Sequence, residues 1–315
     1  MKVSRRGFVA GVAGFAALSA TGAAPEVSGG VDQAVIDTHI HIWDLKTLNP
    51  PWLTTAPQVL RQKYMAEEYR KATEGLNIKR AVYVEIAEAA HRQVAEAEFI
   101  IELIRSKTAH IVAAVIGGDP AADSFPQYVR RFSRTPQVKG VRCPLRKDFA
   151  SDEKCIKGMR LLGELGMSFD LVLGADLLEE AARLAELCPQ TQFILDHCGS
   201  GSAQWYEDGA RQRQAWEKGL ASLAEKKNVV CKISGVAEQS EGEGSAARLR
   251  PVVEQCLARF GEDRVLFASN WPVCLRAITI AQWLRAVQQI AGQHPEGRAR
   301  KLFHDNAVRW YRLNG

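Results

Sequence analysis

The chain has 315 residues, of which 46% are hydrophobic and 24% are charged, and its formal net charge is +5. This length and composition are typical of a soluble globular protein with room for one large α/β domain or two medium ones. Past the first residues there is no block of lysine and arginine, and no apolar run reaches the length of a membrane span. We therefore expect neither a nucleic-acid partner nor stable membrane insertion.

The N-terminus has the features of an export signal. Arg5 and Arg6 precede an apolar run of small residues over 10–20, which ends in Thr21-Gly22-Ala23-Ala24. Paired arginines, a weakly hydrophobic core and an A-x-A-like end are typical of a twin-arginine signal. We predict a signal peptide over 1–24 and a linker over 25–34, and hence a periplasmic or secreted protein that engages the twin-arginine export machinery. A disordered basic start is the alternative.

The seven cysteines contain no C-x-x-C pair, and most lie within apolar patterns. Free thiols that are buried as small hydrophobic side chains are the expected state. This agrees with folding in a reducing cytoplasm before export.

The first predicted strand, Val35–His41, ends in a His-x-His pair. Residues two apart in a strand share a face, so Asp37, His39 and His41 are expected to line up. Two imidazoles about 7 Å apart, by the rise of a strand, can close on one metal ion as neutral ligands. Two polar residues where a strand meets solvent are the alternative.

From Val35 onward, short strand-like runs alternate with longer amphipathic stretches. The predicted strands are Val35–His41, Arg80–Ala87, His110–Gly118, Val138–Leu145, Ser168–Gly174, Gln192–Gly199, Val229–Val236 and Val265–Val273. The predicted helices include Arg92–Lys107, Ala122–Arg134, Asp152–Leu165, Ala175–Cys188, Arg211–Lys227, Gly244–Phe260 and Ile280–Gly292. Apolar positions there recur at three and four, as helices require.

Eight strands, each followed by a helix, predict an α/β protein with a single (β/α)₈ TIM-barrel domain over 35–315. A doubly wound open sheet is the alternative, but no glycine-rich phosphate loop follows the first strand. The insertion Thr47–Met65 contains three prolines and is expected to form an irregular loop over the barrel mouth. The tail Glu296–Leu313 is expected to form a closing helix.

Two more chemically distinctive residues fall where barrel enzymes carry their active sites, at the carboxyl ends of strands. The strand over 192–199 brings His197, and the strand over 265–273 brings Asn270. His197 could instead be a core histidine satisfied by Asp196, but strict alternation points Asp196 away from it. We therefore predict His197 in the site.

Alternation places charged residues of other strands in the same region. Along 80–87 it puts Val82 and Val84 on an apolar face and aims Glu85 at the barrel interior. The same reasoning turns Lys232 inward and brings Arg142 to the end of its strand. A charge in a packed core costs several kcal/mol, roughly, unless it is paired, so these residues predict a polar site.

These motifs resemble the amidohydrolase superfamily, in particular the amidohydrolase-2 family of TIM-barrel hydrolases with its sugar-lactone hydrolases and 2-pyrone-4,6-dicarboxylate lactonases. The matching stretches are IDTHIHIWD (36–44), VKGVR (138–142), ILDHCG (194–199), NVVCKISG (228–235) and LFASNWPV (266–273). The resemblance implies that His39, His41 and His197 form a three-imidazole metal site. It also implies that Arg142 holds a substrate carboxylate or carbonyl.

Asn270 departs from the family pattern, because the family has an aspartate there as general base and often as metal ligand. An amide has no titratable proton acceptor and binds a metal ion less well than a carboxylate. Three outcomes stay open: a mononuclear site with one divalent ion, zinc or manganese; metal-free hydrolysis; and a barrel that binds without catalysis. Glu85 is the candidate replacement base.

We therefore predict a hydrolase that opens a lactone of a sugar acid, or of a related carboxylic acid, by attack of water at a histidine-lined barrel mouth. A non-catalytic lactone-binding or sugar-acid-binding barrel and an amidohydrolase-2-type decarboxylase are the alternatives. The expected partner is a small-molecule substrate, and a homodimer is compatible with the sequence. The candidate catalytic residues are His39, His41, His197, Asn270 and Glu85, and the candidate substrate-binding residues are Arg142, Lys232 and Trp43.

Overall fold

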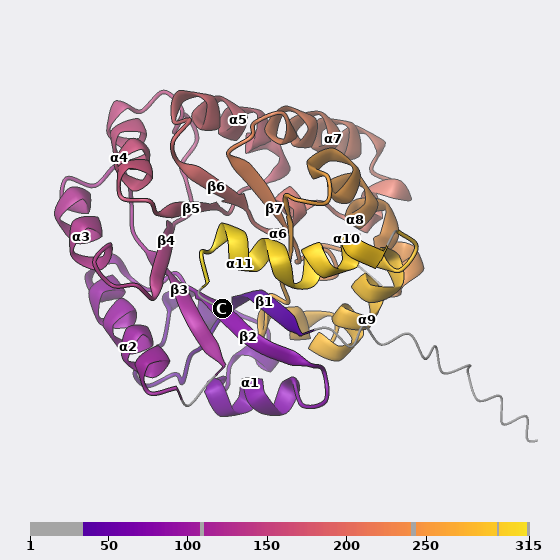
Figure 1. Cartoon of the computed structure of the whole chain (residues 1–315), viewed down its shortest axis with the longest axis horizontal. Coiled ribbons are helices and arrows are strands. Elements are labelled where there is room, and N and C mark those ends of the chain that lie inside the picture. Colours follow the sequence, from indigo (N-terminus) through magenta and orange to yellow (C-terminus); the bar gives the residue numbers. More distant parts are fainter. Residues whose placement is uncertain (1–33, 108–109, 241–243, 295, 314–315) are drawn as a thin grey trace, which may run out of the picture. The chain divides into compact units, whose positions relative to one another are not determined.

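The computed structural model describes residues 34–107, 110–240, 244–294 and 296–313. Its centre is a sheet of eight parallel strands that are hydrogen-bonded in sequence order (Figure 1). All eight predicted strands are present. They are β1 Val35–Ile40, β2 Ile78–Val84, β3 Ile111–Gly117, β4 Val138–Arg142, β5 Ser168–Leu171, β6 Gln192–Leu195, β7 Val229–Ile233 and β8 Val265–Phe267.

The segment that follows β8 closes the sheet against β1. The amide of Asn270 donates to the carbonyl of His39 at 2.9 Å, and the amide of His41 donates to the carbonyl of Trp271 at 2.7 Å. The Thr38 hydroxyl adds a bond of 2.8 Å to the carbonyl of Phe267. The sheet is therefore a barrel, which confirms the predicted (β/α)₈ architecture over the open doubly wound alternative.

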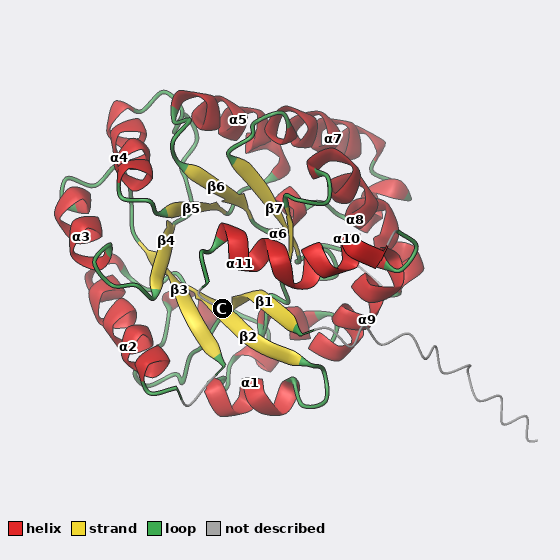
Figure 2. Ribbon diagram, viewed as in Figure 1, coloured by secondary structure: helices red, strands yellow, loops and turns green. Residues whose placement is uncertain are grey.

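Helices surround the strands on the outside (Figure 2). They are α1 Ala66–Ala72, α2 Gln93–Arg105, α3 Phe125–Phe132, α4 Glu153–Glu164, α5 Leu178–Leu187, α6 His197–Ser200, α7 Ala210–Ala224, α8 Ala246–Phe260 and α9 Ile280–Ala291. Each predicted helix corresponds to one of these, whereas the short α1 and α6 were not predicted. Helix α2 buries Ala97, Ile100, Ile101 and Ile104, the three-and-four spacing that covers one helix face.

The apolar interior has two layers. An outer layer lies between strands and helices, and an inner cluster fills the barrel. The inner cluster contains Ile36, Val82, Val84, Ala113, Val115, Ile194, Val230, Leu266, Ala307, Tyr311 and Leu313.

The last three members of the inner cluster come from the C-terminal segment, which crosses one end of the barrel (Figure 1). This segment consists of α10 Glu296–Arg300, a π-helical turn Lys301–Asp305 and α11 Asn306–Trp310. The predicted closing helix is thus three short helical pieces that plug the barrel end.

The strands end earlier than the sequence pattern predicts. Strand β8 ends at Phe267 and not at Val273, and β6 ends at Leu195 and not at Gly199. The residues that follow these strands bond to neighbouring segments, and four of them, His197 to Ser200, have positive φ values of 52–61°. Because an L-residue in this left-handed region cannot continue a strand, the chain turns at the barrel mouth.

The insertion after β1 is largely irregular, as predicted, but it contains two short 3₁₀ turns, Pro51–Thr54 and Gln58–Leu60. All seven cysteines are free and buried, which confirms the sequence-based expectation. Three of them, Cys198, Cys231 and Cys256, have sulfur atoms within 4.8 Å of one another.

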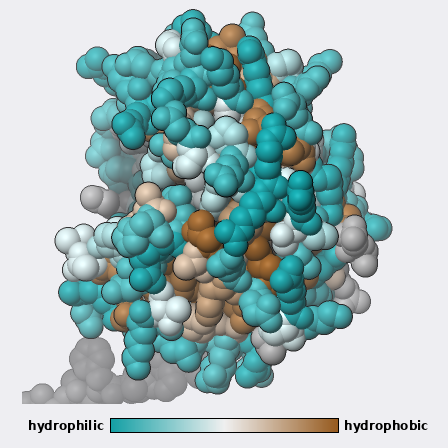
Figure 3. Space-filling model, turned by 90° about the vertical axis from the view of Figure 1, so that its left-hand side faces the viewer, coloured by the Kyte–Doolittle hydropathy of each residue, from teal (hydrophilic) through white to brown (hydrophobic). Residues whose placement is uncertain are grey.

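The predicted signal peptide lies outside the described residues, as does the predicted linker except for its last residue. Within the described ranges, no helix is long and apolar enough to cross a membrane. The molecular face in Figure 3 is mostly hydrophilic, with a small hydrophobic area near its centre.

Candidate active site

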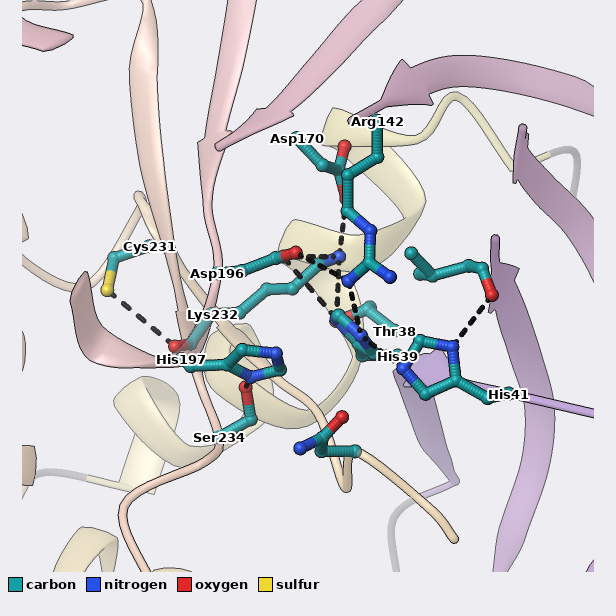
Figure 4. Close-up of polar contacts among 12 residues, drawn as sticks. Thr38, His39, His41, Arg142, Asp170, Asp196, His197, Cys231, Lys232 and Ser234 are labelled. Carbon is teal, nitrogen blue, oxygen red and sulfur yellow. Dashed lines mark hydrogen bonds and ion pairs between the residues drawn. The ribbon is translucent and has the colours of Figure 1, made fainter. Parts of the chain in front are cut away.

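His39 and His41 meet at the carboxyl end of β1. Their Nε2 atoms lie 3.1 Å apart, and both side chains are buried. The third predicted histidine is close, because the ring centroids of His39 and His197 are 4.6 Å apart (Figure 4). The structure therefore brings the three predicted imidazoles into one cluster.

Asp37 does not join this cluster, although strict alternation groups it with His39 and His41. Its carboxylate accepts a bond from Tyr69 of the outer helix α1 at 2.9 Å and another from the amide of Ser269 at 2.8 Å. The pairing of β1 with β2 shifts register between Asp37 and Ile40. This irregularity interrupts the alternation of side chains. Asp37 therefore bonds to α1 and to the segment after β8, while the histidines face the barrel mouth.

Glu85 reaches the site by a different route from the predicted one. Val82 and Val84 belong to the inner cluster, whereas the Tyr83 hydroxyl bonds to Glu96 on α2 outside the barrel. The faces predicted for this strand were therefore wrong. Glu85 lies beyond the last residue of β2, where the chain turns and carries its carboxylate to Arg142.

Arg142 is fully engaged by protein groups. Its Nε donates to Glu85 Oε1 at 2.6 Å, and Nη2 donates to the Glu85 carbonyl at 2.7 Å. Its Nη1 lies 3.3 Å from Asp196 Oδ2 and 3.3 Å from His39 Nε2. Burial works against the charged guanidinium, but Glu85 and Asp196 outweigh it and raise the pKa of Arg142. The predicted substrate ligand is thus held in place before substrate arrives.

Lys232 lies at the centre of a second charged group. Its Nζ is 2.5 Å from Asp170 Oδ2 and 3.0 Å from Asp196 Oδ1, and all three side chains have no exposed surface. It also lies 3.3 Å from Nδ1 of His39. Figure 4 shows Lys232, Asp196 and Arg142 directed toward His39. One continuous network therefore links both cations to the histidine cluster.

The pKa values of the two aspartates move in opposite directions. Burial raises the pKa of Asp170 to about 6, although Lys232 opposes the shift. Burial acts on Asp196 in the same sense, but Lys232 and then His39 hold its pKa well below the ordinary range. Of these two aspartates, Asp196 therefore has the lower proton affinity.

His197 projects from the left-handed turn α6. Its Nδ1 lies 2.9 Å from the hydroxyl of Ser234, which follows β7. Gly235 has a φ of 72°, and a Cβ atom there would lie 2.5 Å from Cβ of His197. Glycine is required at 235 for both reasons, because any side chain would displace the histidine.

The three histidines are neutral at physiological pH. Burial lowers the pKa of His41 to about 3 and that of His197 to about 4, and it lowers the pKa of His39 well below its ordinary value. His41 Nδ1 lies 2.9 Å from the Val84 carbonyl, which can only accept. The proton of His41 is therefore on Nδ1, and the lone pair of Nε2 faces His39.

His39 has partners for either of its neutral tautomers. With the proton on Nε2 it donates to His41, and its Nδ1 accepts from Lys232 Nζ. With the proton on Nδ1 it can donate to Asp196 Oδ1, 3.4 Å away, and the lone pair of Nε2 faces His41 and Arg142. Histidine ligands in metal sites commonly have such a carboxylate behind them.

The donor set fits one divalent cation. His39, Asp196 and His197 each offer a ligand atom within 4.8 Å of the others, and His41 adds a fourth donor beside His39. Neutral imidazole nitrogens suit zinc and related ions. In the network, three carboxylates (Glu85, Asp170 and Asp196) face two cations (Arg142 and Lys232), an excess of one negative charge. That excess favours a cation at the histidines.

Asn270 lies beside the cluster and not within its charge network. Its backbone φ is 59°, and its side-chain amide donates to Glu238 Oε1 at 2.9 Å. Trp43 has no exposed surface, and its indole N–H donates to the carbonyls of Leu60 and Gln62. The structure thus places Trp43 in packing contacts under the loop that follows β1.

The sequence-based prediction missed Asp170, Asp196 and Glu238. Asp170 was recognisable as an ionisable residue inside an apolar strand, and Asp196 shares its side of the chain with the inward-facing Ile194. Both signals are present in the sequence, but the predicted site was built on histidine ligands. Glu238 lies in a loop and carries no comparable signal.

Three comparisons place the chain among known proteins. A model of the family described as Amidohydrolase matches residues 36–313. An uncharacterised protein of Sinorhizobium fredii, y4mH, is 28% identical over 304 residues, which cover 90% of this chain and 99% of that protein. An L-fucono-1,5-lactonase of Burkholderia multivorans is 26% identical over 292 residues, which cover 88% of this chain and 96% of that enzyme.

A solved structure shares the fold. It is a zinc-bound amidohydrolase from Burkholderia multivorans with a TM-score of 0.78 and 22% identity, and the match covers 90% of this chain and 100% of that one.

Proposed function

This chain belongs to the amidohydrolase family, and we propose that it hydrolyses an uncharged lactone of a sugar acid. Relatives named as L-fucono-1,5-lactonases support a lactone, and the charges of the site support an uncharged one. Water attacks the ring carbonyl, and the ester bond to the ring oxygen breaks. The product is an open-chain hydroxy acid.

The observation that carries this proposal is the pairing of the two buried cations. Arg142 and Lys232 both contact carboxylates of the protein, so neither is free to bind a carboxylate of the substrate. A dianionic substrate such as 2-pyrone-4,6-dicarboxylate would need unpaired cations to offset its loss of hydration. A neutral lactone needs only hydrogen-bond partners for its hydroxyl groups.

The guanidinium of Arg142 can stabilise the negative charge that develops during the reaction. Negative charge develops on the acyl oxygen as water adds to the carbonyl. The guanidinium of Arg142, 3.3 Å from His39 Nε2, is fixed next to the histidine cluster and offers that oxygen positive potential. Preorganised charge of this kind, held in place by Glu85 and Asp196, needs no rearrangement during the reaction.

We propose that one divalent ion completes the site and that His39, His41 and His197 would hold it. Such an ion lowers the pKa of a bound water to near 7. Asp196 would accept the Nδ1 proton of His39 and hold its ring in the ligand tautomer. Metal-free hydrolysis is the alternative, and the metal content of the active protein distinguishes the two.

The test combines metal analysis with a substrate panel. We expect the purified protein to contain about one zinc or manganese ion per chain and to release acid from sugar 1,5-lactones such as L-fucono-1,5-lactone. His41→Asn should reduce both metal content and turnover. His294→Asn is the matched control, because His294 pairs with Glu254 outside the site.

Other results would reject the proposal. Turnover of 2-pyrone-4,6-dicarboxylate but of no sugar lactone would contradict the neutral-substrate assignment. Release of carbon dioxide from aromatic carboxylic acids would identify a decarboxylase. Lactone binding without any turnover would identify a non-catalytic barrel. Full activity in protein stripped of metal would reject the role of the ion alone.

A further inference from the structure

We propose that Glu238 is the catalytic base of this site and that Asn270 is the positioning residue that holds it. This inference rests on the proposed lactone hydrolysis. Asn270 follows β8 at the barrel mouth, and its amide donates to Glu238 Oε1 at 2.9 Å. The end of β8 thus offers an amide, and the carboxylate comes from the loop after β7, across one hydrogen bond.

The two sides of this hydrogen bond are connected to the histidine cluster by the backbone. On one side, the amide of Asn270 donates to the carbonyl of His39 at 2.9 Å. On the other, Ser234 bonds to His197 and Gly235 packs against it, and Glu238 follows three residues later. Glu238 therefore lies between Asn270, which bonds to the backbone of His39, and the segment that contacts His197.

The loop that carries Glu238 is anchored on both sides of it. The amide of Gln239 donates to the carbonyl of Gly235 at 3.1 Å, and the Ser202 hydroxyl donates to the carbonyl of Gln239 at 2.7 Å. The Ser240 hydroxyl donates to the carbonyl of Val236 at 2.6 Å. These contacts limit how far the carboxylate can move.

The other carboxylates near the histidines are unsuitable as bases. Both oxygens of Glu85 accept bonds, one from Arg142 and one from the amide of Ala87 at 2.6 Å. Asp196 contacts Lys232 and Arg142, and Lys232 and then His39 hold its pKa well below the ordinary range despite burial. By contrast, the side-chain hydrogen bond described for Glu238 comes from a neutral amide.

The surroundings of Glu238 adjust its proton affinity. The charged and titratable groups that act on it are the guanidinium of Arg276 and the thiol of Cys198, and the thiol of Cys274 lies close enough to be affected in turn. Burial raises the pKa of Glu238 to about 7, while the Asn270 amide and Arg276 oppose the shift. A carboxylate with this pKa can both accept and return a proton near neutral pH.

The proton balance of the reaction is complete with this one group. Glu238 takes a proton from water as the water oxygen bonds to the lactone carbonyl carbon. The tetrahedral intermediate then collapses, the bond from that carbon to the ring oxygen breaks, and the ring oxygen receives the proton from Glu238. The carboxylate is regenerated, and the hydroxy acid leaves.

An exchange of the two groups across the hydrogen bond tests the inference. We expect Glu238→Gln to lower kcat by about 10²–10³-fold with little change in KM, and to change the pH profile of kcat/KM near pH 7, where Glu238 titrates in the parent. The double variant Glu238→Gln/Asn270→Asp places the carboxylate on the other side of the same bond. It should recover at least about tenfold of the lost kcat.

The controls separate chemistry from folding. Glu254→Gln removes a carboxylate on α8 that pairs with His294, and it should leave kcat and the pH profile unchanged. Circular dichroism and thermal unfolding confirm that each variant is folded. Glu238→Gln with parental kcat and pH profile overturns the inference while leaving the proposed function intact. No turnover by the parent contradicts both.

Discussion

At the scale of single residues, the least expected side chain is Lys232. An ammonium group without exposed surface is tolerated only when carboxylates compensate for its lost hydration. Asp170 and Asp196 do so at 2.5 and 3.0 Å. Lys232 in turn keeps Asp196 ionised, and Asp196 stands behind His39. Its role is therefore to hold the charge distribution on which the histidines depend.

Replacement of Lys232 should accordingly cost more than replacement of its nearest partner. We expect Lys232→Met to lower the free energy of unfolding by about 3–5 kcal/mol, because it leaves buried carboxylates uncompensated. Asp170→Asn should cost only about 1–2 kcal/mol, because Lys232 keeps its contact with Asp196. Urea unfolding at pH 7 in the presence of a chelator measures both values. An equal loss in the two variants would contradict this view of the network.

Residue types were easier to predict from the sequence than side-chain directions. His39, His41 and His197 were recognisable because imidazoles at the ends of apolar strands, in a repeated strand-helix pattern, are typical of a site at a barrel mouth. Directions failed where alternation stopped. The register shift in β1 turns Asp37 outward. Because β2 ends at Val84, the direction of the Glu85 side chain no longer follows the alternation of the strand. Neither irregularity has a signature in the hydropathy pattern.

At the scale of elements, the contact between α2 and β2 contains a buried acid. Glu96 Oε1 accepts from the Tyr83 hydroxyl at 2.7 Å and from the amide of Ile86 at 3.0 Å. Burial, and then the charge of Glu85, raise the pKa of Glu96 to about 8. The helix therefore packs on the strand best when this carboxyl is protonated.

This arrangement predicts a pH dependence of stability with a definite sign. The folded pKa lies above the ordinary value of 4.5, so the stabilisation is complete below about pH 4.5 and is lost as the pH rises toward 8. Glu96→Gln keeps an acceptor for both bonds and removes the titration. At pH 8.5, roughly, it should raise the free energy of unfolding by about 1–3 kcal/mol over the parent. Thermal unfolding of both proteins across the pH range provides the measurement, and parallel curves would refute the assignment.

The order of elements was predictable, whereas their ends were not. Runs of Val, Ile and Leu between amphipathic stretches indicate buried parallel strands, and every one of the eight was found. The ends were placed too late because site residues such as His197 continue the apolar sequence pattern without pairing in the sheet. A left-handed turn, and not pairing in the sheet, determines the backbone there.

At the scale of the whole molecule, the barrel has one apolar end and one polar end. The C-terminal segment plugs the first with Ala307, Tyr311 and Leu313, and the Tyr311 hydroxyl reaches Asp170 at 3.2 Å. The plug and the charged network are therefore in direct contact through the barrel axis. The sequence predicted a closing helix at this position but could not show that it touches the site, because that contact joins residues 141 positions apart.

The burial of all seven thiols has a consequence for how the molecule can be studied. A thiol reagent cannot reach these sulfurs in the closed protein, so the rate of modification at each one measures the opening of its own surroundings. Cys143, at 9% exposure beside the barrel mouth, should react first. Cys198, Cys231 and Cys256, with no exposed surface, should react only as β7 and α8 separate.

Mass spectrometry after timed labelling would resolve these rates. If Cys256 were modified as fast as Cys143, the two regions would open together. The native cysteines, from Cys143 after β4 to Cys256 in α8, can thus report local opening without an introduced probe. The rates of modification of these native thiols would report local unfolding in the regions around the candidate site.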